Sequence, residues 1–434
     1  MQRVAITTLG CKINQFESAA MTESLDREGF QLVPFEDEAD IYVINTCTVT
    51  ARTDAESRRL IRRAMRRNPA ARVVVTGCYA QVAPDAVGEL PGVSLVVGNS
   101  EKKGIAGLLR DAVPAEKILV SDISRQRTAE ALGLESFAEH TRAFLQVQNG
   151  CDAFCSYCIV PHARGRSRSV PFRDVLEGIG TFAGQGFREV VLTGIHLGAY
   201  GADLEPPASL LDLLAAADAE ALVPRLRVGS VEPHEISDGL IGLMARSPVI
   251  CPHLHIPLQS GSDSVLERMN RRYTAAFFRE RVERLAAAVP DICIGCDVIA
   301  GFPGETDEEF AATLALLEGL PIAHLHVFPF SRRQGTPAAR MPGQVDGKIV
   351  RERAEVLRAL SDRKREAFHR CFMGRDLPVL VLNGRGKEVT GLSRNYITVR
   401  IETATPPPAG EVMVRVTGVE ADGVRGVIPE PARN

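Results

Sequence analysis

Strand-like and helix-like segments alternate along most of this chain, and this alternation constrains its fold more than any other feature. Short apolar runs rich in β-branched residues, such as Val4–Leu9 and Ile41–Thr46, are each followed by a longer stretch with helical spacing. Strands joined through helices pair in parallel, because the helix has to carry the chain back along the sheet. The chain is therefore predicted to belong to the α/β class, with its ligand sites at the carboxyl ends of the strands.

Length and pattern divide the 434 residues into three predicted domains. Residues 1–113 alternate in the way that predicts a doubly wound parallel sheet. Residues 137–367 contain six strand–helix units, which predict a partial (β/α)6 barrel. From residue 370 to residue 434, short strands separated by turns predict a small closed all-β barrel.

Three cysteines follow the first strand of the predicted barrel in the pattern C-x3-C-x2-C: Cys151, Cys155 and Cys158. A zinc ion or a complete iron–sulfur cluster normally takes four protein ligands. Three thiolates on one loop suit a [4Fe-4S] cluster that keeps one iron open for the amino and carboxyl groups of S-adenosylmethionine. We therefore predict that these cysteines hold a catalytic cluster; unrelated cysteines, or a zinc site completed by His162, are the alternatives.

Three more cysteines lie just after predicted strands of the first domain and just before helices: Cys11, Cys47 and Cys78. A parallel sheet brings such strand ends to one edge, although the cysteines are far apart in the sequence. This arrangement predicts a second three-thiolate iron–sulfur cluster, again with an open iron. Three buried free cysteines are the alternative, because cysteine is commonly a small core residue.

Glycines and polar residues end the later strands of the predicted barrel: Gly194, Glu232, Gln259 and Gly301. A glycine or an acid at a strand end is often only a turn device. One such residue at each strand nevertheless predicts a rim that binds the cofactor. Gly194 would let the backbone approach the methionyl amino group, and Gly301 would do the same for an adenine edge.

The four cysteines outside these groups are predicted to be core residues: Cys251, Cys293, Cys296 and Cys371. Cys293 and Cys296 have C-x2-C spacing, but they lie in an apolar strand, where side chains three apart point to opposite faces. His253 and His255 could share one face of a strand. For these histidines we expect structural roles and no metal.

The net charge of the chain is -3, so a nucleic acid could bind only to local patches of positive charge. Six arginines crowd one predicted helix: Arg58, Arg59, Arg62, Arg63, Arg66 and Arg67. Spacings of three and four put most of them on one face, which indicates a phosphate backbone as partner. A solvated helix face is the alternative. The C-terminal barrel has nearly balanced charge, so an RNA-binding role and a stabilising role both stay open for it.

Cysteine usage and the start of the chain indicate the cytoplasm. Ten cysteines in a chain of this size argue for metal binding or catalysis rather than for a disulfide framework. The sequence opens directly on a strand-like run, without the pattern of a signal peptide. The apolar runs are far shorter than the ~20 residues that cross a bilayer, so no membrane partner is expected.

These segments together resemble the methylthiotransferase family of radical S-adenosylmethionine enzymes over nearly the whole chain. Besides the cysteine loop, the resemblance rests on residues 8–18, 45–49, 76–81, 161–169, 255–261, 269–274, 301–306 and 326–331. It implies an N-terminal cluster domain, a radical S-adenosylmethionine barrel and a C-terminal TRAM domain. It also implies two [4Fe-4S] clusters: the N-terminal one carries the sulfur that one S-adenosylmethionine methylates. A second S-adenosylmethionine at the barrel cluster yields the radical that removes hydrogen from C2 of adenosine.

Within the family, residues 9–14 and 192–201 look most like the MtaB branch. That branch converts N6-threonylcarbamoyladenosine at position 37, in the anticodon loop of tRNA, to its 2-methylthio derivative. Sister branches act on isopentenyladenosine in tRNA or on a ribosomal-protein aspartate, and a non-catalytic iron–sulfur or zinc RNA-binding protein is the alternative from another class. The resemblance further implies Arg164 and Glu232 as cofactor contacts, and a reductant protein such as flavodoxin or ferredoxin.

Overall fold

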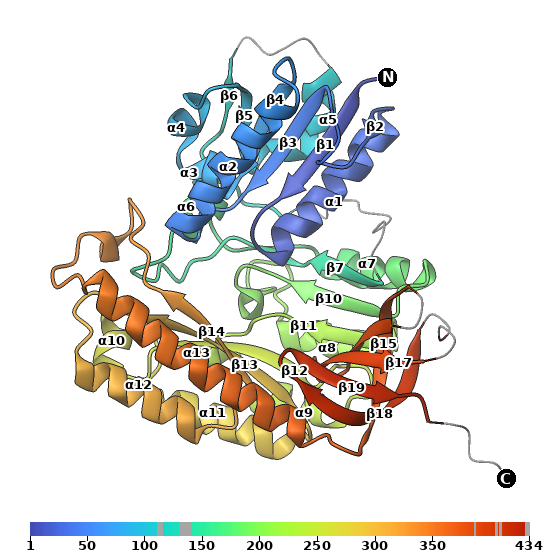
Figure 1. Cartoon of the computed structure of the whole chain (residues 1–434), viewed down its shortest axis with the longest axis vertical. Coiled ribbons are helices and arrows are strands. Elements are labelled where there is room, and N and C mark those ends of the chain that lie inside the picture. Colours follow the sequence, from blue (N-terminus) through green and yellow to red (C-terminus); the bar gives the residue numbers. More distant parts are fainter. Residues whose placement is uncertain (111–115, 130–140, 386–387, 404–406, 408–409, 430–434) are drawn as a thin grey trace.

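The computed structural model describes residues 1–110, 116–129, 141–385, 388–403, 407 and 410–429, which form three successive parts (Figure 1). The first part is a six-stranded parallel sheet in the order β2-β1-β3-β4-β5-β6. Its strands are β1 (Arg3–Thr8), β2 (Gln31–Leu32), β3 (Ile41–Thr46), β4 (Arg72–Gly77), β5 (Val93–Val97) and β6 (Ile118–Leu119). Its helices are α1 (Lys12–Arg27), α2 (Ala51–Arg67), α3 (Cys78–Val82), α4 (Pro84–Gly88) and α5 (Ile105–Arg110).

The second part is the predicted partial barrel, built from two three-stranded parallel sheets, β7-β10-β11 and β12-β13-β14. Its strands are β7 (Arg142–Gln146), β10 (Glu189–Thr193), β11 (Arg225–Val228), β12 (His253–Gln259), β13 (Cys293–Ala300) and β14 (His324–Pro329). Single bridges, Leu226–Ile250 and Ser230–His255, connect the two sheets. A short antiparallel pair, β8 (Gln148–Asn149) and β9 (Arg168–Ser169), brackets the cysteine loop.

Helices cover the outside of this barrel, and one prediction about them is wrong. They are α7 (Phe172–Gly184), α8 (Leu210–Ala219), α9 (Asp238–Arg246), α10 (Asp263–Arg268), α11 (Ala275–Ala288), α12 (Asp307–Gly319) and the long α13 (Gly347–Arg370). The short helix α6 (Val160–Arg164) follows the cysteine loop and lies against the N-terminal part. The periodicity of residues 265–288 predicts one helix, but the structure has two, α10 and α11. Asn270, between them, takes the left-handed conformation (φ 59°), which ends the first helix.

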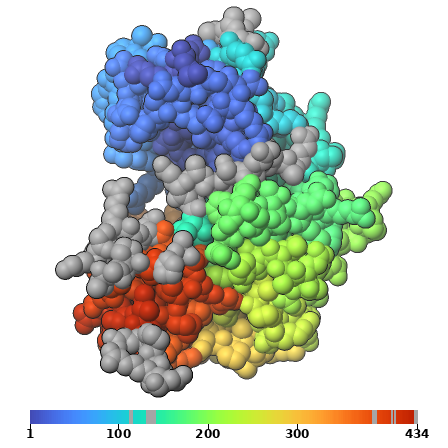
Figure 2. Space-filling model, turned by 90° about the vertical axis from the view of Figure 1, so that its right-hand side faces the viewer, coloured from blue at the N-terminus to red at the C-terminus, as the bar shows by residue number. Residues whose placement is uncertain are grey.

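The third part is a closed barrel in the strand order β15-β16-β17-β19-β18. Its strands are β15 (Asp376–Arg385), β16 (Glu388–Ser393), β17 (Thr398–Glu402), β18 (Glu411–Glu420) and β19 (Gly423–Val427). The closed barrel is as predicted, although the sequence pattern indicates only four of its strands and misses β16. Figure 2 shows this part (red) beside the central barrel (green to yellow), with the N-terminal part (blue) above.

Buried ion pairs fix the C-terminal barrel to the central one. Arg225 and Arg227 on β11 are fully buried and both pair with Glu189 on β10. Arg225 also donates to the backbone oxygens of Leu392 and Ser393, at 3.0 Å each. These contacts place the end of β16 against the β7-β10-β11 sheet of the central barrel.

Three of the four remaining cysteines are buried as predicted: Cys251, Cys293 and Cys296. Cys371 is exposed at the end of α13, so its prediction as a core residue is wrong. The predicted boundaries near residues 113 and 137, and the final residues up to 434, lie outside the described residues. Among the helices that the structure describes, none combines the length and the apolar character needed to cross a membrane.

Candidate active site

The barrel cysteine loop leaves strand β8 through a tight turn at Gly150. This glycine has φ 74°, and a β-carbon there would lie 1.8 Å from the backbone oxygen of Arg166. The backbone N–H of Cys151 donates to the oxygen of Gly165 at 3.0 Å. The loop is thus closed at its base by backbone contacts that only glycine permits.

The same loop is fastened to the break between α10 and α11. The N–H of Ser156 donates to the oxygen of Met269 at 3.0 Å, and its hydroxyl donates to the oxygen of Arg268 at 2.8 Å. The side-chain amide of Asn270 donates to the oxygen of Phe154 at 3.0 Å. The helix is interrupted, therefore, where the chain supplies partners to the cysteine loop.

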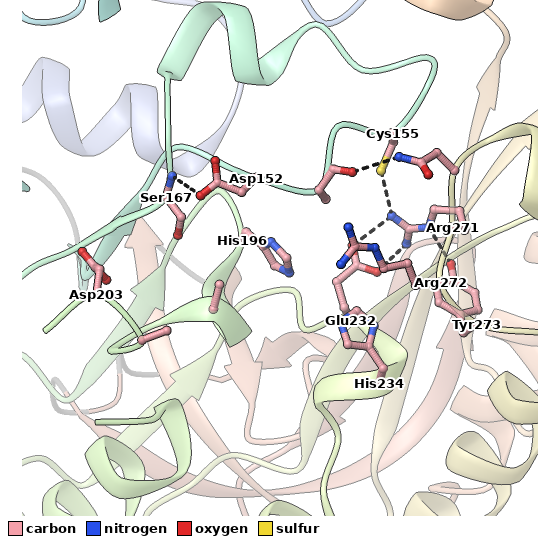
Figure 3. Close-up of a pocket in the computed structure, with 14 residues that line it drawn as sticks. Asp152, Cys155, Ser167, His196, Asp203, Glu232, His234, Arg271, Arg272 and Tyr273 are labelled. Carbon is pink, nitrogen blue, oxygen red and sulfur yellow. Dashed lines mark hydrogen bonds and ion pairs between the residues drawn. The ribbon is translucent and has the colours of Figure 1, made fainter. Parts of the chain in front are cut away.

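A cavity of about 340 Å³ opens beside these cysteines (Figure 3). Arg271 donates to the sulfur of Cys155 at 3.4 Å and forms an ion pair with Glu232 across the cavity wall. Burial raises the pKa of Glu232, although Arg271 acts in the opposite direction. On the other side, Nδ1 of His196 lies 3.6 Å from the sulfur of Cys151.

These residues fit a cluster with a bound, zwitterionic cofactor. Three thiols share one loop, and a guanidinium and an imidazole lie against two of their sulfurs, where they can offset the charge of ligating thiolates. Glu232 lies in the cavity wall, within reach of an ammonium group. The cavity is thus suited to hold the cluster-bound end of S-adenosylmethionine.

The three N-terminal cysteines follow β1, β3 and β4, which are adjacent strands of one sheet. Gly10 has φ 103°, and a β-carbon at this position would lie 2.9 Å from the sulfur of Cys47. Burial, and the neighbouring thiol of Cys78, raise the pKa of Cys47 to about 11. Cys47 and Cys78 are buried and Cys11 is exposed. Buried thiols ionise readily only when a cation compensates them, as the irons of a cluster do.

A buried charge network closes this second group. The side chain of Arg164 donates from Nε to the sulfur of Cys78 at 3.2 Å and pairs with Glu17 and Asn14. Lys102 also pairs with Glu17, at 2.7 Å. Burial would raise the pKa of Glu17, but Arg164 and Lys102 lower it to about 2, so the carboxylate stays ionised.

The two cysteine groups are neighbours in space. Helix α3 begins at Cys78, and it packs against helix α6, which begins two residues after Cys158. A cavity of about 190 Å³ is lined on one side by Val49 and Thr50 of the N-terminal part, which follow Cys47 in the sequence. Tyr157, Gln259 and Phe328 from the barrel are on the other side. This cavity therefore has in its wall residues that neighbour Cys47 and Cys158 in the sequence, one cysteine of each group.

Comparisons with known proteins agree with this geometry. Residues 3–98 match the uncharacterized protein family UPF0004, and residues 145–317 match the radical SAM superfamily. The chain is 44% identical, over 365 residues, to the threonylcarbamoyladenosine tRNA methylthiotransferase MtaB of Bacillus subtilis, covering 83% of this chain and 81% of the relative. This chain belongs to the MtaB family of methylthiotransferases.

A sister group of this family is more distant. The tRNA-2-methylthio-N(6)-dimethylallyladenosine synthase of Cereibacter sphaeroides is 32% identical over 434 residues, 98% of each chain. The structure also resembles that of the radical S-adenosylmethionine methyltransferase TsrM of Kitasatospora setae, with a TM-score of 0.56, 18% identity and coverage of 78% and 75%. That likeness confirms the predicted α/β fold. The predicted cofactor types, a [4Fe-4S] cluster and S-adenosylmethionine, are those of the radical SAM superfamily.

The predicted cofactor residues lie in different places around the family's site. Glu232 lines the cavity beside the barrel cysteines, whereas Arg164 lies at the N-terminal ones. Gln259, with φ 69°, lines the cavity of about 190 Å³. A β-carbon at Gly194 would lie 3.0 Å from the side-chain oxygen of Gln148, and one at Gly301 would lie 2.4 Å from Val350 of α13. Contacts of these five residues with a cofactor stay predictions.

Sequence reasoning missed Arg271 and His196 as neighbours of the cysteines. Arg271 lies in a segment that resembles the family, residues 269–274, but the expected continuous helix hid its role. His196 follows Gly194 directly after β10, where the strand-end rule that selected Gly194 could also have found it. Lys102 completes the network around Glu17. No pattern in the sequence predicts this ion pair.

Proposed function

We propose that this chain transfers a methylthio group to C2 of N6-threonylcarbamoyladenosine at position 37, in the anticodon loop of tRNA. The observation that carries the proposal is that the helices beginning at Cys78 and just after Cys158 pack together, beside a cavity lined by residues that neighbour Cys47 and Cys158 in the sequence. The identity to MtaB relatives, and the lower identity to the dimethylallyladenosine enzymes, favour the threonylcarbamoyl nucleoside as substrate.

Two [4Fe-4S] clusters and two molecules of S-adenosylmethionine would supply a 5′-deoxyadenosyl radical and a methylated sulfur. Cys151, Cys155 and Cys158 would hold one cluster, with Arg271 and His196 against their sulfurs. Cys11, Cys47 and Cys78 would hold the other, with the guanidinium of Arg164 against Cys78. With three thiolates, each group would leave one iron of a [4Fe-4S] cluster without a protein ligand and open for the cofactor or the sulfur.

The cavity of about 190 Å³ would receive the adenine base. Its aromatic walls include Tyr157, which is buried in part, and Phe328, which is 38% exposed. An exposed aromatic face suits stacking of an unpaired base, as RNA-binding proteins commonly use it. Thr50, the N-cap of α2, lines the same cavity. Helix α2 therefore starts at the cavity that would hold the base and runs away from it.

Helix α2 would bind the phosphate backbone of the anticodon stem and loop. Arg59 pairs with Glu56, Arg63 pairs with Glu36, and Arg58 donates to the hydroxyl of Tyr79. Arg62 and Arg66 are exposed and have no acidic partner in the part of the chain that the structure describes. Two free cations one helical turn apart suit successive phosphates.

The proposal is tested by measuring two products of the reconstituted enzyme with tRNA that carries the unmethylthiolated nucleoside. Cys155→Ala should abolish formation of 5′-deoxyadenosine and of the methylthio nucleoside together. Cys47→Ala should keep the first and lose the second, because only the sulfur site is damaged. Cys371→Ala, which changes an exposed cysteine outside both groups, is the matched control and should behave as wild type.

Three outcomes would contradict the proposal. Methylthiolation of isopentenyladenosine instead would point to the sister tRNA branch, and a mass change of a ribosomal protein would point to the aspartate branch. Binding of tRNA without any cleavage of S-adenosylmethionine would indicate a non-catalytic RNA-binding protein. The cytoplasmic location and a flavodoxin or ferredoxin as reductant stay predictions.

A further inference from the structure

Three histidines converge on the inner strands of the barrel, outside both cysteine groups. His255 lies on β12, and His324 and His326 lie on β14, with β13 between these strands. Their ligand nitrogens all lie within 4.8 Å of one another. Imidazole nitrogens brought so close together are the donor set of a zinc-type site.

Gly295 of β13 leaves room at the centre of this group. In the sheet, Gly295 pairs with His255 on one side and with His324 on the other. A β-carbon at Gly295 would lie 2.5 Å from Nδ1 of His255 and 2.7 Å from Nε2 of His324. Metal–imidazole bonds are about 2.0–2.1 Å long, so one point in this space is close to bonding distance from two nitrogens. Any other side chain at this position would fill that space.

A carboxylate orients the first of these rings. Oδ1 of Asp297, two residues after Gly295, lies 2.7 Å from Nε2 of His255 and 3.4 Å from Nδ1 of His326. Histidines that bind metals usually donate their second ring N–H to a carboxylate, which fixes the tautomer and leaves the other nitrogen free. His255 therefore presents the lone pair of Nδ1 to the space at Gly295.

The other two rings complete the arrangement. Nδ1 of His324 lies 3.8 Å from the sulfur of Cys293, so its Nε2 is the nitrogen that faces the central space. The ring of His326 stacks on that of His255, with centroids 4.6 Å apart, and its side chain is 56% exposed. The group is thus buried at one end and open at the other, where a further ligand can enter.

Contrary to the structural role that the sequence predicts for His255, we propose that His255, His324 and His326 bind one divalent transition-metal ion of the zinc class, with Asp297 as the residue that positions His255. Three nitrogens leave a fourth position of a tetrahedral ion open for water or for an oxygen ligand. This site shares no residue with either cysteine group, although Asp297 also lines the 190 Å³ cavity. Metal binding by the three histidines does not require the reaction proposed above. The second histidine group, His196 with His234 and Glu235, is a weaker candidate, because His196 faces Cys151.

The test uses the full chain after reconstitution of its iron–sulfur clusters, so that cysteines do not compete for zinc. Zinc chloride is added, weakly bound metal is removed by dialysis, and zinc per chain is measured by mass spectrometry. X-ray absorption at the zinc edge then identifies the ligands. We expect one zinc per chain with imidazole nitrogens at about 2.0 Å. Affinity should fall by about tenfold or more in His324→Gln and His326→Gln.

His326→Gln keeps the test meaningful if His324→Gln, at a half-buried position, fails to fold, because the side chain of His326 is 56% exposed. His234→Gln is the matched control and should retain the zinc; iron per chain shows that each variant still holds its clusters. A sulfur shell at about 2.3 Å would overturn the proposal. Equal retention by wild type and both triad variants, or loss of zinc in His234→Gln, would overturn it as well.

Discussion

Arg164 shows how one buried charge can organise a cluster site. Its side chain is 1% exposed and contacts Cys78 of α3 together with Asn14 and Glu17 of α1, so residues from two different helices meet at one guanidinium. A buried arginine is tolerated only when its charge is paired and its N–H groups are satisfied. Together with Lys102 it gives the network around Glu17 one excess positive charge, which favours thiolates at the neighbouring cysteines.

Replacing Arg164 by glutamine should damage both stability and the N-terminal cluster. Breaking a buried ion pair costs about 3–5 kcal/mol, because the partner is left with uncompensated charge. We expect this loss in the free energy of unfolding of the cluster-free protein, measured by denaturant titration. After reconstitution, Arg164→Gln should lose the iron of the N-terminal cysteines and keep that of the barrel, as iron analysis and electron paramagnetic resonance can show.

Arg166→Gln is the control for this experiment. Its ion pair with Asp152 is exposed, and exposed pairs contribute only about 0–1 kcal/mol. Equal stability and equal iron content in both variants would show that the buried network has no special role.

At the scale of helices and strands, the spacing of apolar residues predicts most of the fold, because each helix or strand buries one face and the residues of that face recur at a fixed interval. The predicted strand at residues 41–46 matches β3, and that at residues 4–9 matches β1 to within one residue at each end. The pattern fails where distant contacts decide the conformation, as at Asn270, which leaves the helix in order to bind the cysteine loop. It also fails at β16, where Gly391 has no side chain to contribute to the apolar pattern. A β-carbon at Gly391 would lie 2.4 Å from the side chain of Val379 on β15, so Val379 occupies the space.

Asn270 contributes to the anchoring of the cysteine loop in two ways, through its side-chain hydrogen bonds and through its left-handed backbone conformation. Asn270→Ala should weaken the anchoring of the cysteine loop by about 2–3 kcal/mol. Two amide hydrogen bonds, to Ala153 and Phe154, contribute about 1 kcal/mol each, and the left-handed conformation adds about 1 kcal/mol for alanine. The rate of 5′-deoxyadenosine formation should fall, because the cluster loop is displaced.

Asn270→Gly is the informative partner of this variant. Glycine accepts the positive φ without strain but lacks the amide, so its rate should lie between those of alanine and wild type. Identical rates for glycine and wild type would mean that the backbone conformation alone, and not the hydrogen bonds, holds the loop.

For the whole molecule, the sequence predicts which residues form each cysteine group but not how the parts are joined. Spacing and strand ends select all six cysteines, because both signals are local or follow from parallel topology. The residues that connect the parts give no such signal. Glu17 and Arg164 are 147 positions apart, and Asp54 and Arg333 are 279 apart, so neither pairing follows from any pattern within one element.

The Asp54–Arg333 pair makes a testable link between structure and reaction. Arg333, just beyond β14, is largely buried and pairs with Asp54 of α2 at 2.7 Å, and it also donates to Thr48, the residue after Cys47. The pair thus fixes the N-terminal cysteines relative to the barrel. Asp54→Asn should leave each cysteine group intact while loosening their alignment.

The expected result is a separation of two reactions. Formation of 5′-deoxyadenosine depends only on the barrel residues and should stay near wild type in Asp54→Asn. Methylthiolation needs the substrate aligned with both groups, and a displacement of about 1 Å can slow such a step about a hundredfold. The ratio of 5′-deoxyadenosine to methylthio nucleoside should therefore rise steeply, as liquid chromatography with mass spectrometry can measure.

Asp238→Asn, which removes an exposed acid that pairs with Arg281 and Arg284 on the outside of the barrel, should leave this ratio unchanged. A parallel fall of both products in Asp54→Asn would mean that the pair stabilises the fold and does not align the groups. A raised ratio without loss of iron would instead show that the enzyme depends on its two parts being held in register. In that case the two cysteine groups act as one site, although they are carried by separate parts of the chain, the N-terminal sheet and the barrel.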